Sequence, residues 1–380
     1  MRDLPILERI ERELEEFRSS GLWRSLPEPV RVPVDLSTNS YLSLQDHPDV
    51  VREARELAGG RLGGNLASRL VGTVSDLYGR LERELALWKG TESALVFGSG
   101  YAANVGILSA LGGPGVEVFC DRLNHASILD GIRLGGGRLI RYRHLDMKDL
   151  ESRLAASSSK EKILVTETVF SMDGDVAPLA DLCELADRYG CLVVVDEAHA
   201  AGVFGRGRAS GVAEEAGCEE RIEVRVGTLS KAVAGAGGFF AGPGRLRDYL
   251  VNRARPLIFS TGLPPAVLAW DLAAVGHIRR NPGTGRELLA RAAGFRERLR
   301  AAGFDVGASS SQIVPLIVGG NERVRDLSRH LLERGIKAPA IRSPAVPRGT
   351  ERVRLSLHAG IGPAQEDLVL SALKEWRGRG

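Results

Sequence analysis

The sequence predicts an α/β protein with a mostly parallel sheet, followed by a smaller α+β region. Between about residues 75 and 275, short apolar runs alternate with helical stretches, and this order is typical of crossover units that place helices on both faces of a parallel sheet. From about residue 276, two long helical stretches alternate with two strand-like ones. A chain of 380 residues, of which 43% are hydrophobic, is long enough for two such domains.

The elements divide the chain into three parts. Apolar residues recur at helical spacing through Leu7, Ile10, Leu14 and Phe17, which predicts an amphipathic N-terminal helix, and an extended arm follows it. Acidic residues run through this helix, so it does not have the composition of a signal or transit peptide. We predict a helix and arm over residues 1–45, a large domain over 46–275 and a small domain over 276–380. The last boundary rests on the Asn-Pro-Gly cluster in "RRNPGTGR".

Six strands of the large domain can be located. They are expected at Ala94–Phe97, Val116–Cys120, Lys162–Glu167, Leu192–Asp196, Ile222–Gly227 and Gly238–Ala241. Helical stretches such as "SDLYGRLERELALW", "YAANVGILSAL", "HASILDGIRL" and "APLADLCELADRYG" lie between several of them. In parallel sheets the ligand crevice lies beyond the carboxyl ends of the strands. Functional side chains are therefore expected just after the strands.

Composition narrows the class of protein. The 51 basic and 48 acidic residues give a net charge of +3, which does not favour a nucleic-acid partner. No apolar run approaches the length of a membrane span. The four cysteines, at positions 120, 183, 191 and 218, form no CxxC pair and no metal-ligand spacing, so we expect reduced thiols in a cytoplasmic protein without a metal.

Polar residues follow three of the strands. Asp196 ends "CLVVVD" and His199 comes three residues later, Glu167 and Ser171 follow the preceding strand, and His125 begins a helix after the strand at 116–120. A carboxylate at the end of a buried strand is costly unless it meets a cation. Each residue alone also fits a plainer role, such as a helix cap, a salt bridge or an ordinary loop position.

Two glycine-rich stretches complete the pattern. "VFGSGYAANVG" places Gly98, Ser99 and Gly100 between a strand and a helix, where free N–H groups bind phosphate. Neither GxGxxG nor GxxxxGK[ST] occurs, which disfavours a nicotinamide-dependent oxidoreductase, the alternative from another class. In "VGTLSKAVAGAGG", Lys231 follows a strand and the hydroxyls of Thr228 and Ser230. A lysine there is either a solvated charge or, in a desolvated pocket, a nucleophile.

Together these groups match the requirements of pyridoxal phosphate. The cofactor needs a lysine for an imine and an acid for its ring nitrogen, which Lys231 and Asp196 supply. The turn at Ser99 and Gly100 supplies a phosphate cradle, and His125 and His199 supply rings to lie against the heterocycle. No single one of these residues is specific for pyridoxal phosphate, but the combination is.

At this point the sequence resembles the α-oxoamine synthases, which are pyridoxal-phosphate enzymes. The resemblance rests on "VFSMDGD", "DEAH" and "PAVPRGTERVRLSL" above all, and on further stretches that span nearly the whole chain, such as "ELALWKGTESALVFGSGYAANVG" and "GTLSKAVAGAGG". It implies the aspartate-aminotransferase-like fold (fold type I), with a mostly parallel seven-stranded sheet flanked by helices in the large domain and a smaller α+β C-terminal domain. It also implies a cytoplasmic homodimer with shared active sites.

The resemblance further implies a reaction. An amino acid and an acyl-CoA would condense with loss of CO2 to give an aminoketone and CoA, and the similarity is greatest to the biotin-pathway branch, which joins L-alanine to pimeloyl-CoA. A glycine acyltransferase or an aminotransferase of the same fold is the alternative, because those enzymes share the cofactor residues. A protein that keeps the fold without catalysis is a further alternative.

Residue roles follow from the same resemblance. Lys231 would carry the cofactor, Asp196 would pair with its ring nitrogen and His125 would stack on its ring. The other implied contacts are His199 and Ser171 near the ring's 3-oxygen; Gly100, Tyr101 and Thr228 at the phosphate; Ser260 and Thr261 at the partner's phosphate; Arg354 and Asn39 at the amino-acid carboxylate; Glu167 near the reacting carbons; and Arg24 at the acyl-CoA.

The chain departs from the family pattern at two places. Ala345, in "SPAVP", stands where the biotin-pathway enzymes commonly have a threonine whose hydroxyl is thought to touch substrate. Ser230 and Ala232 flank the lysine where glycines often occur. Neither change removes a cofactor group, but both bear on the choice of substrate.

Overall fold

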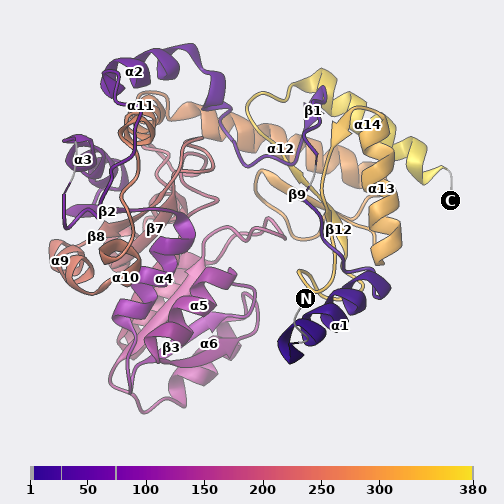
Figure 1. Ribbon diagram of the computed structural model, residues 1–380. Helices are drawn as coiled ribbons and strands as arrows, with labels where there is room; N and C mark the ends of the chain where they lie inside the picture. The colour runs from indigo at the N-terminus through magenta and orange to yellow at the C-terminus, as the bar shows by residue number, and fades with distance from the viewer. Residues whose placement is uncertain (1–3, 27, 73–74, 379–380) are drawn as a thin grey trace. The chain divides into compact units, whose positions relative to one another are not determined.

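A computed structural model of the chain describes residues 4–26, 28–72 and 75–378. The chain divides into two units, residues 1–33 and residues 34–380. The first unit contains helix α1 (Pro5–Ser19), where the apolar spacing predicted one. All of the remaining elements belong to the second unit (Figure 1).

A seven-stranded sheet forms the centre of the large domain. Its strands lie in the order β2-β8-β7-β6-β5-β3-β4, and β8 runs antiparallel to both of its neighbours while the other neighbouring pairs are parallel. This confirms the mostly parallel sheet. The strands are β2 (Ser93–Phe97), β3 (Glu117–Asp121), β4 (Arg138–Tyr142), β5 (Lys162–Glu167), β6 (Cys191–Asp196), β7 (Val224–Thr228) and β8 (Gly238–Gly242).

Six of these strands lie within one or two residues of the predicted positions, and β4 is the one that the sequence analysis did not locate. It is an edge strand that pairs only with β3 among the described residues, and its first four residues are exposed or half-buried. The apolar runs by which the other strands were recognised come from burial on both faces, which an edge strand of this kind lacks.

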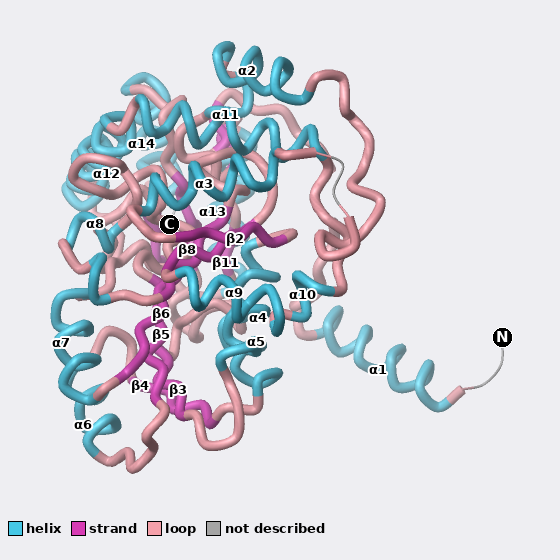
Figure 2. The backbone as a smooth tube through the Cα atoms, turned by 90° about the vertical axis from the view of Figure 1, so that its left-hand side faces the viewer, coloured by secondary structure: helices cyan, strands magenta, loops and turns pink. Residues whose placement is uncertain are grey.

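Helices cover both faces of the sheet. One face packs against α4, α5, α9 and α10, and the other against α3, α6, α7, α8 and α11 (Figure 2). The helices before the small domain are α2 (Pro48–Ala58), α3 (Leu77–Lys89), α4 (Gly100–Leu111), α5 (Ala126–Gly135), α6 (Met147–Ala155), α7 (Leu179–Tyr189), α8 (Val212–Ala216), α9 (Gly244–Arg253), α10 (Arg255–Ile258) and α11 (Pro265–Arg280), with 3-10 turns at Leu44–Asp46 and Glu219–Arg221.

Left-handed glycines end two of the helices that lead into the sheet. Gly90 (φ 61°) follows α3 and Gly190 (φ 65°) follows α7. A residue with a side chain is strained at such angles, so glycine lets the chain turn directly from helix to strand. Strands β2 and β6 begin three residues and one residue later, respectively.

The C-terminal part is built on a second, antiparallel sheet. Strands β11 (Ala340–Ile341), β12 (Arg352–Ser356) and β9 (Ile313–Ile317) pair in that order, and α12 (Gly283–Ala301), α13 (Asn321–Glu333) and α14 (Pro363–Arg377) accompany them. Strand β1 (Val34–Asp35), from the arm, pairs in parallel with β10 (Ile336–Lys337). Through this pairing the arm joins the C-terminal part of the fold. Strand β12 belongs to the separate three-stranded sheet.

The predicted boundary between the domains falls inside a helix. Helix α11 runs without interruption through residue 275 to Arg280, and α12 begins at Gly283 after the Asn-Pro pair. The Asn-Pro-Gly cluster therefore marks the break between two helices, while the extent of each domain stays a prediction. Among the described residues, no helix combines the length and the apolar character needed to cross a membrane.

Candidate active site

Strands β5, β6 and β7 end side by side at one edge of the sheet. Glu167, the last residue of β5, is paired in register with Asp196, the last residue of β6, and Asp196 is opposite Val226 of β7. Thr228 ends β7 two residues further on. Because parallel strands deliver their carboxyl ends to one edge, two carboxyl groups and a hydroxyl come together there.

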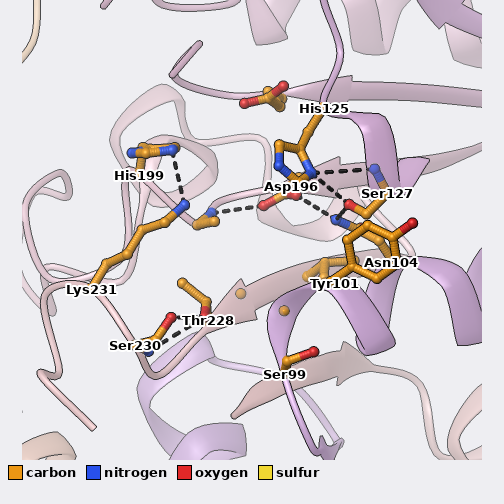
Figure 3. A pocket seen from close by; sticks show the side chains of 15 residues that line it. Ser99, Tyr101, Asn104, His125, Ser127, Asp196, His199, Thr228, Ser230 and Lys231 are labelled. Atoms are coloured by element: carbon orange, nitrogen blue, oxygen red, sulfur yellow. Dashed lines mark hydrogen bonds between the residues drawn. The ribbon is translucent and has the colours of Figure 1, made fainter. Parts of the chain in front are cut away.

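A cavity of about 280 Å³ lies at this edge (Figure 3). It brings together eight of the predicted site residues from five parts of the chain. Its lining comprises Ser99, Gly100, Tyr101, Asn104, His125, Ser127, Glu167, Asp196, Ala198, His199, Val226, Gly227, Thr228, Ser230 and Lys231.

The Asp196 carboxylate is held from two directions. One oxygen accepts the Ala198 N–H at 2.8 Å, and the other accepts the Asn104 side-chain amide at 2.7 Å. The same amide nitrogen lies 3.0 Å from the Ser127 hydroxyl, which in turn lies 2.7 Å from His125 Nδ1. These contacts hold the Asp196 carboxylate and the His125 imidazole in fixed positions relative to each other (Figure 3).

Lys231 enters the cavity opposite these groups. Its Nζ is 2.8 Å from His199 Nε2, and His199 Nδ1 is 2.6 Å from the Tyr41 hydroxyl. Burial, together with the charges of Lys231 and Arg354, holds the pKa of His199 well below its ordinary value, so the ring is neutral. Burial also lowers the pKa of Lys231 to about 8, against the attraction of Asp196 and Glu167. A minor fraction of this amine is therefore unprotonated at neutral pH, and that fraction grows as pH approaches 8.

Glu167 is a buried acid with an unused oxygen. The residue is 3% exposed, and its Oε1 has no hydrogen-bond partner. Burial and the nearby charge of Asp196 raise the pKa of Glu167 to about 8, so its carboxyl group is mostly protonated at neutral pH. A buried polar atom without a hydrogen-bond partner is unusual in a folded protein. Glu167 is also one of the residues that line the cavity.

The cradle expected for phosphate is formed by close backbone contacts. Helix α4 begins at Gly100, and Ser99 Oγ caps it by accepting the Ala102 N–H at 3.0 Å. A Cβ at Gly100 would lie 3.1 Å from Thr228 Cβ, and one at Gly238 would lie 2.4 Å from the Ser99 carbonyl oxygen. Only glycines let these segments meet. The Ala102 and Ala103 N–H groups bond Ser99, whereas the Gly100 and Tyr101 N–H groups at the start of α4 have no carbonyl one turn earlier to bond and are available to an anion.

Three further predicted residues form a cluster beside the cavity rather than lining it. Arg354 on β12 donates to the Ser171 carbonyl at 2.6 Å and to Asn39 Oδ1 at 3.1 and 3.2 Å. The Tyr41 hydroxyl lies 3.2 Å from the same Asn39 oxygen and also contacts His199. Tyr41 thus links this arginine cluster to the lysine.

The structure does not bring the other four predicted residues to this cavity. Ser260 and Thr261 are exposed and line a separate hollow with Arg69 and Tyr78. Ala345 is exposed in the loop between β11 and β12, where its N–H bonds the Arg342 carbonyl. Arg24 belongs to the N-terminal unit. Their roles stay predictions.

Comparison with known proteins identifies the family. Residues 31–373 match the family of class I and II aminotransferases. The 8-amino-7-oxononanoate synthase of Anaeromyxobacter dehalogenans (strain 2CP-1) is 44% identical over 373 residues, which covers 95% of this chain and 93% of that protein. The chain belongs to the α-oxoamine synthases within the class I and II aminotransferase family.

Solved structures of other α-oxoamine synthases share the fold. A structure of serine palmitoyltransferase with pyridoxal phosphate is 32% identical, with a TM-score of 0.91 over 100% of this chain and 99% of that one. The 8-amino-7-oxononanoate synthase of Francisella tularensis is 25% identical, with a TM-score of 0.77 over 91% of this chain and 98% of that one. These likenesses confirm the predicted aspartate-aminotransferase-like fold.

The cavity of this α-oxoamine synthase fits pyridoxal phosphate in its donor set. A buried amine, an ionisable acid held at a fixed angle, a helix N-terminus and a threonine hydroxyl surround one space. These are a partner for an aldehyde, a partner for a pyridine nitrogen and donors for a phosphate. Glu167 is a further member of the lining.

Sequence reasoning missed four residues that organise the site. Asn104 and Ser127 hold Asp196 and His125, Tyr41 contacts His199, and Gln312 donates to the His199 carbonyl at 2.8 Å. Asn104 lies inside a helix and Gln312 lies more than a hundred residues from its partner. Of these four residues, only Tyr41 could have been found from the sequence, because it lies two residues after the predicted site residue Asn39.

Proposed function

We propose that this protein is a pyridoxal-phosphate enzyme that condenses an amino acid with an acyl-CoA and releases CoA and CO2. L-Alanine and pimeloyl-CoA are the proposed pair, with 8-amino-7-oxononanoate as the product. The observation that carries the proposal is that Lys231 and Asp196 line one cavity at the edge of the sheet. Full-length relatives named 8-amino-7-oxononanoate synthase support the choice of reaction.

The residues would divide the work by position. When bound, the cofactor supplies an electron sink for the bonds at the amino acid's α-carbon. Asp196 would bind the ring nitrogen and keep it protonated, and His125 would lie against the ring. Gly100, Tyr101 and Thr228 would hold the phosphate. Each of these groups already lines the cavity and needs no rearrangement of the backbone to face a ligand there.

Lys231 is the proposed base at the substrate's α-carbon. Its lowered pKa leaves the amine able to accept a proton near neutral pH, and neutral His199 at 2.8 Å orients it. Arg354, with Asn39 beside it, would bind the amino acid's carboxylate, and Ser171 and His199 would lie near the ring oxygen. Protonated Glu167 would donate a hydrogen bond to the reacting substrate.

The remaining proposed contacts concern the acyl-CoA and a second subunit. Arg24 would bind the acyl-CoA, and Ala345 would border the substrate. Ser260 and Thr261 would reach the phosphate of a partner copy in a homodimer. Exposed apolar residues support a dimer at this place: Leu66 and Phe259 are 86% and 71% exposed, and the Gly262 N–H ties their two segments together through the Ala67 carbonyl. The reduced cysteines agree with a cytoplasmic location.

The test is release of CoA by the purified protein. L-Alanine and glycine are each supplied with pimeloyl-CoA and with acetyl-CoA, and free CoA, CO2 and aminoketone are measured. The proposal predicts the largest kcat/KM for L-alanine with pimeloyl-CoA and equal amounts of CoA and CO2. A preference for glycine with acetyl-CoA would assign the alternative acyltransferase reaction. Conversion of a keto acid without CoA release would indicate an aminotransferase and contradict the proposal.

A further inference from the structure

His144 lies between two acidic groups, Asp121 and Asp175, that come from different segments of the chain. Its Nδ1 is 2.9 Å from Asp121 Oδ1, and its Nε2 is 2.9 Å from Asp175 Oδ2. Its ring also packs edge-on against Phe170, with centroids 4.5 Å apart. A carboxylate only accepts hydrogen bonds, so a ring that serves two carboxylates must donate from both nitrogens and is the cation.

The two acids are attached to segments that carry predicted site residues. Asp121 ends β3, is fully buried and also accepts the N–H groups of Leu123 and Leu145, while His125 follows four residues later. Asp175 ends the tight turn over residues 170–175, where the Phe170 N–H bonds the Asp175 carbonyl and the Gly174 N–H bonds the Phe170 carbonyl. This turn, defined here as the 170–175 turn, contains Ser171.

The 170–175 turn is also the support of Arg354. The Arg354 Nε donates to the Ser171 carbonyl at 2.6 Å, and Arg352, two residues earlier on β12, pairs with Asp173 at 2.5 Å. A shift of the turn would therefore disturb the Ser171 contact that helps to orient the guanidinium proposed to bind the amino acid. His144 holds the turn from the other end, through Asp175.

We propose that protonated His144 is a positioning residue that sets the 170–175 turn, and through it Arg354, for binding of the amino acid's carboxylate. This inference rests on the proposed function for its substrate. It does not make His144 a catalytic residue, because the ring contacts Asp121, Asp175 and Phe170 rather than the cavity.

The surroundings of His144 identify it as the group that titrates. Burial alone would lower the pKa of His144, but the hydrogen bonds to Asp121 and Asp175 outweigh it and raise the pKa to about 9. Tyr142 on β4 and Cys120 on β3 also face Asp121, and burial raises the pKa of both, to about 12 for the thiol, so they stay neutral.

The other charged neighbours belong to the loop and to β12. Arg143, next along the chain, is paired with Asp146 and Asp149, and Arg352 is paired with Asp173. A group with a raised folded pKa contributes stability that is complete below its unfolded pKa and is lost as pH rises through the folded value. The bridge should therefore weaken as pH approaches and passes about 9.

The experiment compares His144→Gln with His330→Gln in the cofactor-loaded protein. His330 is a matched control, because it is a buried histidine on α13 that bonds the Ala372 carbonyl. We expect His144→Gln to raise KM for the amino acid about 10-fold while kcat changes less than about 2-fold, a split that a general loss of folding would not produce. Hydrogen exchange should quicken in peptides that cover residues 168–177. Asp175→Asn should give the same split, and the double variant should be no worse than either single one.

A second measurement needs no substrate. The difference in thermal midpoint between the wild type and His144→Gln should shrink as pH rises from about 7 to about 10, because the wild type loses its bridge. An unchanged KM with unchanged exchange at 168–177, or a midpoint difference independent of pH, would overturn the inference. A wild type without turnover would contradict the proposed function, while the exchange and pH measurements would still decide the role of His144.

Discussion

Replacement of Lys89 by methionine tests the buried ion pair between Lys89 and Glu197. Lys89 on α3 is 0% exposed and Glu197, which directly follows Asp196, is 1% exposed. The Lys89 amine binds Glu197 Oε2 and the Ser210 carbonyl, and Glu197 Oε1 accepts the Ala213 N–H at 2.9 Å. Methionine has a similar length but no charge, so Lys89→Met removes the cation that is hydrogen-bonded to the buried Glu197 carboxylate.

The expected loss follows from that geometry. Removal of one partner from a fully buried pair costs about 3–5 kcal/mol. An unfolding entropy of about 2.1 cal/mol/K per residue gives roughly 0.8 kcal/mol/K for this chain, so the thermal midpoint should fall by about 4–6 °C.

Circular dichroism melts of the cofactor-loaded protein at about neutral pH measure this fall in thermal midpoint. The double variant Lys89→Met with Glu197→Gln is the control, because it removes the buried charge as well as its partner. It should recover more than half of the lost midpoint at neutral pH. A fall of less than about 1 °C in Lys89→Met, or a double variant as unstable as the single one, would refute the reasoning.

Three other predictions concern Gly238, Glu167 and Asp271. Gly238→Ala should weaken cofactor binding about 10-fold in an absorbance titration, because the added Cβ would lie 2.6 Å from the Gly100 nitrogen and displace the start of α4; unchanged affinity would contradict this. Burial raises the pKa of the Glu167 carboxyl to about 8, so the folded protein favours its protonated form and loses stability as pH rises from about 4.5 through 8. Glu167→Gln should therefore reduce the decline in thermal midpoint of the cofactor-free protein over this pH range. An equal decline in both proteins would contradict this. Asp271→Asn should change the free energy of unfolding by less than about 1 kcal/mol in denaturant melts, because burial raises the pKa of Asp271 far enough to keep it neutral, and a larger loss would indicate a charged group.

The sheet and the polar groups at its edge were predictable because strands that are buried on both faces consist of short apolar runs in the sequence. Apolar runs marked the strands buried on both faces, and Asp196, Glu167 and Lys231 each follow such a run. Strand β4 carries arginines at Arg138 and Arg141, so its "RLIRY" is not such a run although it extends the same sheet.

The contacts that orient these groups were not predictable from local pattern. Asn104 reaches Asp196 across 92 positions, and Tyr41 reaches His199 across 158. The position of an amide inside a helix, or of a phenol in a loop, does not indicate its hydrogen-bond partner. The tertiary fold alone determines which residue it contacts. Ser260 and Thr261 line a separate hollow, and the sequence-based prediction assigned them to the phosphate of a partner copy.

The central claim is that the Lys231 amine carries the cofactor. Borohydride reduction of the protein purified with pyridoxal phosphate, followed by digestion and mass spectrometry, tests it most directly. The account predicts the mass of the reduced cofactor on the peptide that contains Lys231, and its loss in Lys231→Ala. A modified peptide elsewhere in the chain, or a protein that takes up no cofactor, would contradict the account.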